Sequence, residues 1–146
     1  FQEAGITLDF VQDNVVSSCQ HVLRGLHYQL PPKTQGKLVS VIGGQILDVA
    51  VDLRRTEPTF GEVVTSRLTA ENGEMLWVPP GFAHGYLVLS EAADVWYKVT
   101  AEYAPTLDRG IRWDDPIIGV PWPVSDPILS PKDRALPSLA QAGGLF

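Results

Sequence analysis

Hydrophobic and polar positions alternate over short stretches along most of this chain, and turn-forming residues separate the stretches. The stretches are rich in β-branched and aromatic residues, a composition typical of β-strands. Gly, Pro, Asn and Asp stand between them, as they do between the strands of antiparallel sheets. The strands predicted from this pattern cover residues 8–12, 22–29, 37–42, 45–53, 61–68, 74–78, 86–89 and 94–100.

Two glycine-containing segments predict tight turns. Gly43-Gly44 lies between two apolar stretches and predicts a hairpin, because glycine accepts the positive φ that such turn positions require. Glu71-Asn72-Gly73 predicts a second tight turn. Strands at this spacing indicate an antiparallel sandwich or a closed barrel.

A helix is predicted near the C-terminal end. Ser130 can cap a helix, Pro131 suits the first helical position and Asp133 falls in the first turn. Few other segments have a helical pattern, so the fold class is all-β, with one or two short C-terminal helices.

Length and charge narrow the function classes. The 146 residues fit a single domain spanning 1–146. A net charge of −6 provides no overall basic field for nucleic acid or anionic lipid, and no apolar stretch approaches the roughly 20 residues that cross a bilayer. The lone Cys19 cannot form an internal disulfide, which indicates a reducing, cytoplasmic location.

The three histidines are the first candidates for chemistry. In strand 22–29, alternation places His27 on one face with Leu23 and Gly25, as expected of a barrel-lining residue. From the strand alone, His27 is equally well a buried structural histidine with one hydrogen bond. His84 follows a Pro-Pro-Gly turn, which either aims its side chain or simply bends the chain, and His21 is predicted in an exposed loop.

Three other polar residues suit proton transfer, and each also has an ordinary structural explanation. Tyr97 shares a strand face with Val95 and Val99, so its ring could simply be packed. Lys37 could be a lone surface lysine, and Asp133 a first-turn carboxylate favoured by the helix dipole.

Longer strings of residues resemble a known family. They occur in the order found in the dTDP-4-dehydrorhamnose 3,5-epimerase family and cover nearly the whole chain. The strings lie at residues 10–14, 23–29, 35–39, 48–54, 58–61, 81–85 and 129–133.

The resemblance implies a fold and an activity. Members of the family are jelly-roll, cupin-like barrels that work without a metal or other cofactor and usually form homodimers. They invert the sugar of dTDP-4-dehydro-6-deoxyglucose at the two carbons beside its ketone.

The resemblance also implies the catalytic residues. His27 matches the proton acceptor, Asp133 the carboxylate that orients it, and Tyr97 the proton donor on the opposite face of the sugar. Lys37 and His84 match polar groups of the sugar pocket, with Lys37 placed to stabilise the oxygen of an enolate. A base, an acid and a cation at the oxygen are what proton exchange beside a ketone requires.

The expected nucleotide-binding residues are also taken from the family. Arg24 suits a diphosphate, and Tyr103 matches an aromatic residue that stacks on thymine. An ideal strand places Arg24 and His27 on opposite faces, so we expect either a bulge near Gly25 or a role for Arg24 in another subunit's site. Asp108 stands where the family usually has Glu. The remaining positions that match are Gln12, Asn14, Asp108 and Lys132.

One segment of the family pattern is not present. An earlier Arg-Gly-x-Phe-x-Glu segment, which supplies the partner subunit's nucleotide site in the family, would lie upstream of Phe1, so the chain is expected to lack an N-terminal segment.

Three alternative functions stand beside double epimerisation. A single-site epimerase would use the same base and acid, and a non-catalytic sugar-nucleotide-binding cupin would use the same pocket. A metal-dependent cupin oxygenase is the weaker interpretation. Pro79, Gly81 and His84 match one metal motif of the cupins, but His27 is the only imidazole where the other motif has two.

Overall fold

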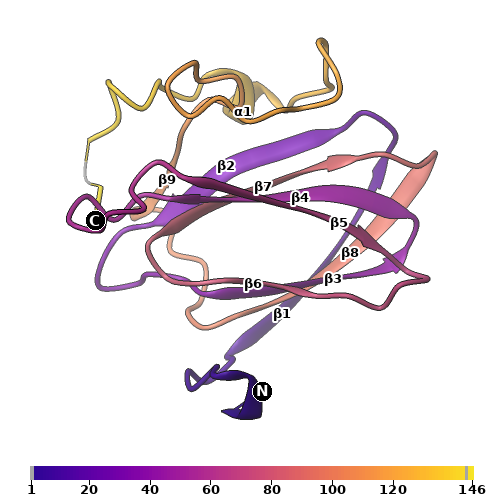
Figure 1. Ribbon diagram of the computed structural model, residues 1–146, viewed down its shortest axis with the longest axis horizontal. Helices are drawn as coiled ribbons and strands as arrows, with labels where there is room; N and C mark the ends of the chain where they lie inside the picture. Colours follow the sequence, from indigo (N-terminus) through magenta and orange to yellow (C-terminus); the bar gives the residue numbers. More distant parts are fainter. Residues whose placement is uncertain (1, 144) are drawn as a thin grey trace.

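Two antiparallel β-sheets face each other in the computed structural model, which describes residues 2–143 and 145–146 (Figure 1). One sheet has four strands in the order β1-β8-β3-β6, and the other has five in the order β5-β4-β7-β2-β9. The strands are β1 (Gln12–Cys19), β2 (Leu23–Gln29), β3 (Lys37–Gly43), β4 (Gln45–Asp52), β5 (Val63–Thr69), β6 (Leu76–Val78), β7 (Phe82–Val88), β8 (Ala92–Val99) and β9 (Asp108–Gly110).

Hydrophobic residues from both sheets fill the space between them. Val39 and Val95 from the four-stranded sheet pack in one buried cluster with Ile46 and Val88 from the five-stranded sheet. A second cluster, which includes Leu26 and other residues of the five-stranded sheet, lies beneath the C-terminal segment. This arrangement confirms the predicted all-β jelly roll.

The predicted first strand, 8–12, is wrong. β1 begins at Gln12 and pairs with β8 along its whole length, from Gln12 opposite Val99 to Cys19 opposite Ala92. The hydrophobic residues that suggested the earlier strand are exposed, with Leu8 46% and Val11 54% accessible. β1 was missed because most of its residues are polar and have a weak preference for β-strands. Its pairing with β8 therefore decides its structure.

The Gly43-Gly44 hairpin is also wrong, because β3 and β4 belong to different sheets. Gly44 has a φ of 79°, and a Cβ there would stand 2.1 Å from the carbonyl oxygen of Ala92. Glycine is therefore needed for a crossing between sheets rather than for a hairpin turn. The turn predicted at Glu71-Asn72 is confirmed.

Strand β7 starts at Phe82, four residues earlier than predicted, which places His84 inside the sheet rather than in a turn. The three-residue β9 was not predicted at all. The C-terminal helix is confirmed as α1 (Pro131–Arg134), in which the Ser130 Oγ accepts a hydrogen bond from the Asp133 N–H. Figure 1 shows α1 above β2, on the outer side of the five-stranded sheet.

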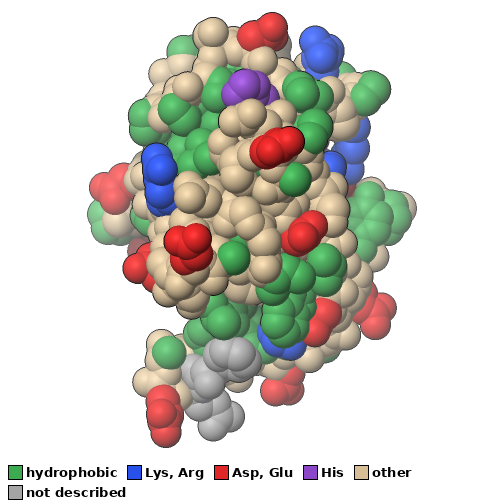
Figure 2. All heavy atoms as spheres, turned by 90° about the vertical axis from the view of Figure 1, so that its right-hand side faces the viewer, with side chains coloured by type: hydrophobic (Ala, Val, Ile, Leu, Met, Phe, Trp, Pro, Cys, Tyr) green, Lys and Arg blue, Asp and Glu red, His purple; other side chains and the backbone are tan. Residues whose placement is uncertain are grey.

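The protein has an acidic surface, and its helices are short in the described residues. Acidic side chains are spread over the whole of the face that Figure 2 shows, in keeping with the net charge of −6. In the described part of the chain, no helix is long and apolar enough to cross a membrane.

Candidate active site

A cavity of about 270 Å³ opens between the two sheets and is lined by polar side chains from both. A neighbouring cavity of about 180 Å³ shares four of its lining residues. Together the two cavities bring all eleven of the predicted site residues to one place. The first is lined by Val16, Arg24, His27, Lys37, His84, Tyr86, Tyr97, Ser130, Lys132 and Asp133, and the second adds Gln12, Asn14, Gln35, Val99, Tyr103 and Asp108.

His27 is held by Asp133. The imidazole Nε2 lies 2.5 Å from Asp133 Oδ1, while Asp133 Oδ2 accepts a hydrogen bond of 3.1 Å from the backbone N–H of Gly25. Burial raises the pKa of Asp133, but its hydrogen bonds with His27 and Gly25 outweigh this effect and leave the pKa below its ordinary value. The carboxylate therefore stays ionised and fixes the ring, which leaves Nδ1 of His27 to take a proton from a ligand.

A bulge in β2 places Arg24 and His27 in the same cavity. The pairing of β2 with β7 shifts register between these two residues, which confirms the predicted bulge. Gly25 has a φ of 124°, and β2 approaches β7 so closely that a Cβ on Gly85 would stand 2.7 Å from the carbonyl oxygen of Arg24. Only glycines allow this close approach.

Lys37 and Tyr97 reach the cavity from the opposite sheet. The Lys37 Nζ lies 5.9 Å from the centre of the Tyr97 ring. Burial lowers the pKa of Lys37 to about 8, although Asp108 and Asp48 act against this shift. Burial raises the pKa of Tyr97, partly offset by Arg24, so Tyr97 keeps its proton at neutral pH.

His84 forms a second histidine–carboxylate pair deeper in the cavity wall. Its Nε2 lies 2.5 Å from Asp48 Oδ1, and both side chains are almost fully buried. His84 lies directly opposite His27 on the paired strand β2. Asp48 was not among the predicted site residues, because in an alternating strand it has no signal that separates it from an ordinary polar residue.

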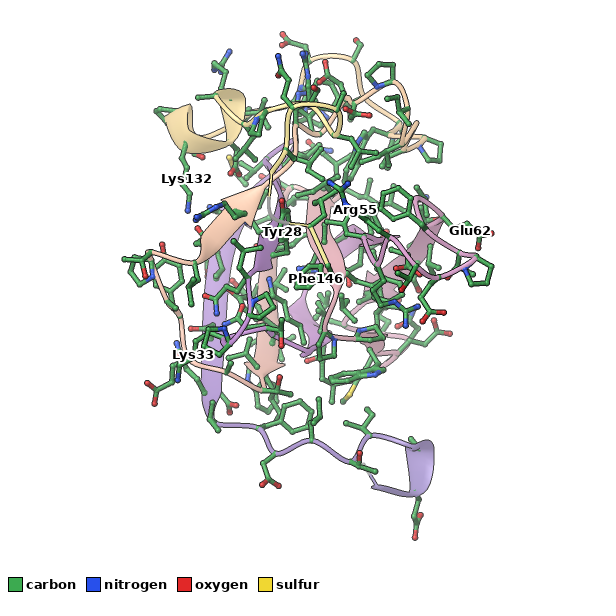
Figure 3. All side chains as sticks on the ribbon, turned by 90° about the vertical axis from the view of Figure 1, so that its left-hand side faces the viewer. Tyr28, Lys33, Arg55, Glu62, Lys132 and Phe146 are labelled. Atoms are coloured by element: carbon green, nitrogen blue, oxygen red, sulfur yellow. The ribbon has the colours of Figure 1, made fainter. Side chains whose placement is uncertain are left out.

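The outer part of the site carries residues suited to a nucleotide. Gln12 Nε2 donates a 2.9 Å hydrogen bond to Asn14 Oδ1, which orients both amides on β1. Lys132 forms an ion pair with Asp108 and stands 5.9 Å from the centre of the Tyr103 ring, which is 55% exposed. Figure 3 shows Lys132 extending from α1 towards the sheet.

Arg24 and Tyr86 also line the first cavity, beside the residues that surround His27. The Arg24 Nε and Nη2 donate hydrogen bonds of 3.1 and 2.9 Å to the Ser18 hydroxyl. Tyr86 and Val16 also line the cavity, although no sequence pattern singled them out. Among the described residues, no group of three or more His, Cys, Asp or Glu side chains is arranged to hold a metal ion.

The chain is similar to known proteins over nearly its whole length. The family model described as dTDP-4-dehydrorhamnose 3,5-epimerase matches residues 1–141. The dTDP-4-dehydrorhamnose 3,5-epimerase of Shigella flexneri is 52% identical over 134 residues, which cover 91% of this chain and 74% of that protein.

Solved structures agree with the sequence comparison. The dTDP-6-deoxy-D-glucose-3,5-epimerase of Legionella pneumophila, in complex with dTDP-4-keto-L-rhamnose, superposes with a TM-score of 0.91 at 49% identity, covering 96% of this chain and 74% of that one. A 3'-monoepimerase from Streptomyces bikiniensis, in complex with dTDP-quinovose, has a TM-score of 0.87 but only 33% identity, covering 95% of this chain and 72% of that one. With this fold, this cavity and these similarities, the chain belongs to the dTDP-4-dehydrorhamnose 3,5-epimerase family.

Proposed function

We propose that this chain is an isomerase that converts dTDP-4-dehydro-6-deoxy-D-glucose into dTDP-4-dehydro-L-rhamnose by inverting C3 and C5. The observation that carries the proposal is the placement of a base and an acid on facing sheets. His27 lies on β2 and Tyr97 on β8, with the cavity between them. A sugar ring bound there presents one face to each residue.

The reaction moves only protons. His27 Nδ1 removes the proton from a carbon beside the ketone, and the electron pair of that C–H bond moves into the carbonyl to form an enolate. Lys37 stabilises the negative charge on the enolate oxygen. Tyr97 then donates its phenolic proton to the same carbon from the opposite face, which inverts the configuration. Before the second carbon reacts, the His27 imidazolium releases the proton it took to solvent, and the Tyr97 phenolate takes a proton back from solvent. No cofactor is needed for these steps.

The nucleotide is assigned to the outer part of the site, which includes the cavity of about 180 Å³. Arg24 and Lys132 are the cations available to a diphosphate, and Tyr103 is an exposed ring on which thymine can stack. The remaining polar residues there, Gln12, Asn14 and Asp108, supply hydrogen-bond donors and acceptors for the base and sugar. His84 completes the sugar pocket, held by Asp48.

Solvent exchange tests the reaction directly. With the dTDP-keto-sugar in D₂O, NMR should show deuterium entering both C3 and C5. Label at one carbon would make the chain a single-site epimerase, and label at neither carbon would exclude epimerisation. The 52% identity to the Shigella flexneri 3,5-epimerase, against 33% to the 3'-monoepimerase, favours both carbons.

A homodimer is the second part of the proposal. The outward face of the four-stranded sheet carries exposed hydrophobic residues, with Val15 60%, Ile42 56% and Met75 53% accessible. A neighbouring apolar depression is lined by Leu38 and Trp96. A second copy of the chain would bury this face, as the family resemblance implies. Light scattering at micromolar concentration should give twice the chain mass, and a monomer there would contradict the proposal.

The proposed location is the cytoplasm, with neither nucleic acid nor membrane as a partner. Cys19 is an exposed free thiol, which is typical of a reducing compartment. Cell fractionation of a tagged protein would test this location.

A further inference from the structure

The hydroxyl of Tyr86 is buried in the wall of the sugar cavity without a hydrogen-bond partner. Tyr86 lies on β7 and is 3% exposed. Among the described residues the Tyr86 hydroxyl has no hydrogen-bond partner, although the nearby Ser18 hydroxyl lowers its pKa slightly. The Ser18 hydroxyl already accepts two hydrogen bonds from Arg24.

An unpaired buried hydroxyl destabilises a folded protein, and phenylalanine would fill the same space without that cost. The other unpaired buried side-chain atom in the described residues, Asp48 Oδ2, belongs to the residue directly opposite Tyr86 on β4. The two unpaired atoms therefore belong to a single cross-strand pair of residues beside the cavity. This placement is expected where a ligand supplies the missing partner.

The position of Tyr86 indicates which part of a ligand it would meet. Tyr86 lines the cavity together with Arg24, assigned to the diphosphate, and Tyr97, assigned to the reacting carbons. The centroid of its ring lies 6.1 Å from that of the His84 ring, on the side of the cavity assigned to the sugar. Burial raises the pKa of Tyr86 to about 12, so its hydroxyl remains a neutral donor at physiological pH.

We infer that Tyr86 is a substrate-binding residue whose hydroxyl donates a hydrogen bond to a sugar oxygen between the diphosphate and the reacting carbons. The inference rests on the proposed function and deepens it. The sugar hydroxyl at C2 and the ring oxygen are the oxygens in that part of the substrate. In the free protein the hydroxyl is unpaired, and the bound sugar satisfies it.

The variant Tyr86→Phe tests the contact, with Tyr28→Phe as the matched control. Tyr28 is equally buried at 3% exposure but lies in the other core cluster, against Phe146. For Tyr86→Phe we expect KM for the dTDP-keto-sugar to rise about tenfold, with kcat changed less than twofold. The inhibition constant for dTDP alone should stay the same, because dTDP has no keto-sugar. Tyr28→Phe should leave all three constants unchanged.

Other results would overturn the inference. An unchanged KM in Tyr86→Phe would leave the hydroxyl a purely structural group, and an equal loss of dTDP affinity would assign it to the nucleotide. Thermal melting checks that Tyr86→Phe is folded, and its melting temperature should not fall because no hydrogen bond is lost in the free protein. Wild-type deuterium exchange, measured alongside, tests the epimerase reaction itself, so failure of that reaction is distinguishable from failure of the Tyr86 contact.

Discussion

At the residue scale, burial of Lys37 makes its charge depend on pH close to neutrality. Its lowered pKa of about 8 means that the ammonium loses its proton well below the usual range for lysine. Because stabilisation of the enolate needs the cation, kcat/KM should fall as pH rises through about 8. A pH–rate profile checks this, and a profile flat to pH 10 would contradict the role of Lys37.

The variant Lys37→Met separates this effect from other titrations. Removing the cation should lower kcat/KM roughly 10²- to 10³-fold and abolish the alkaline fall. It should also change stability. In wild type, unfolding takes up a proton between about pH 8 and 10.5, so stability rises with pH over that range. Denaturant melts of Lys37→Met should lack that rise.

Asp133 should act on the rate through His27. Asp133→Asn keeps an acceptor for the Gly25 N–H but removes the charge that orients and stabilises the protonated imidazole. We expect kcat to fall roughly 10²-fold or more, with KM little changed. The control is Asp114→Asn, which removes a carboxylate from an exposed ion pair with Arg112 and should leave kcat unchanged. Equal losses of kcat in both variants would mean that the effect is not specific to the His27–Asp133 pair.

Sequence reasoning located these residues through the order of family strings, not through their individual surroundings. His27 alone is equally well a structural histidine, and only the fold brings Asp133 to it from 106 positions away. Tyr86 and Asp48 had no signal, because an alternating strand gives every inward residue the same pattern. What distinguishes them is a missing hydrogen bond, which depends on neighbours from other strands.

At the element scale, the bulge in β2 decides whether the site is assembled. Gly85→Ala would place its Cβ 2.7 Å from the Arg24 carbonyl oxygen and 2.9 Å from Leu26 Cδ2, so β2 must move away from β7. We expect stability to fall by about 1–3 kcal/mol and kcat/KM to fall at least tenfold as His27 is displaced. Gly143→Ala is the control, since a Cβ there meets nothing within 4 Å. Full activity in a folded Gly85→Ala protein would show that the bulge does not position His27.

The elements that the sequence predicted well are those with strong internal patterns. Strands β3 to β5 and β8 each contain two or more β-branched residues, and α1 has a capping serine and a proline at its start. β1 and β9 were missed because pairing with β8 and β2 defines them, and their own composition is weak. The Gly43-Gly44 segment shows the same limit, since no local signal distinguishes a hairpin from a crossing between sheets.

At the scale of the whole molecule, the two facing sheets place the proposed acid and the proposed base on opposite sides of one cavity. The strands that carry His27 and Tyr97 are not neighbours in either sheet, and only the way the sheets close on each other sets them across a cavity. A sequence pattern shows which face of a strand is buried, but not which other strand that face meets.

The acid stability of the whole fold should depend on a buried carboxylate that lines neither cavity of the candidate site. Asp52, 1% exposed, accepts hydrogen bonds from Arg54 and Thr59 at the end of β4, and the bonds from Arg54 lower its pKa to about 2. Because the pKa is lower than in the unfolded chain, this stabilisation is complete above about pH 4 and is lost as pH falls towards 2. It amounts to about 2 kcal/mol, allowing for the partial exposure of Arg54.

Asp52→Asn should therefore lower the free energy of unfolding by about 2 kcal/mol at pH 7, and its difference from wild type should shrink as pH falls from 4 to 2. Urea melts across this pH range measure the difference. Asp13→Asn, which removes the carboxylate of an exposed ion pair with Lys98, should change stability by less than about 0.5 kcal/mol at every pH. A difference for Asp52→Asn that stayed constant with pH would mean that lost packing, and not the charge of Asp52, accounts for the destabilisation.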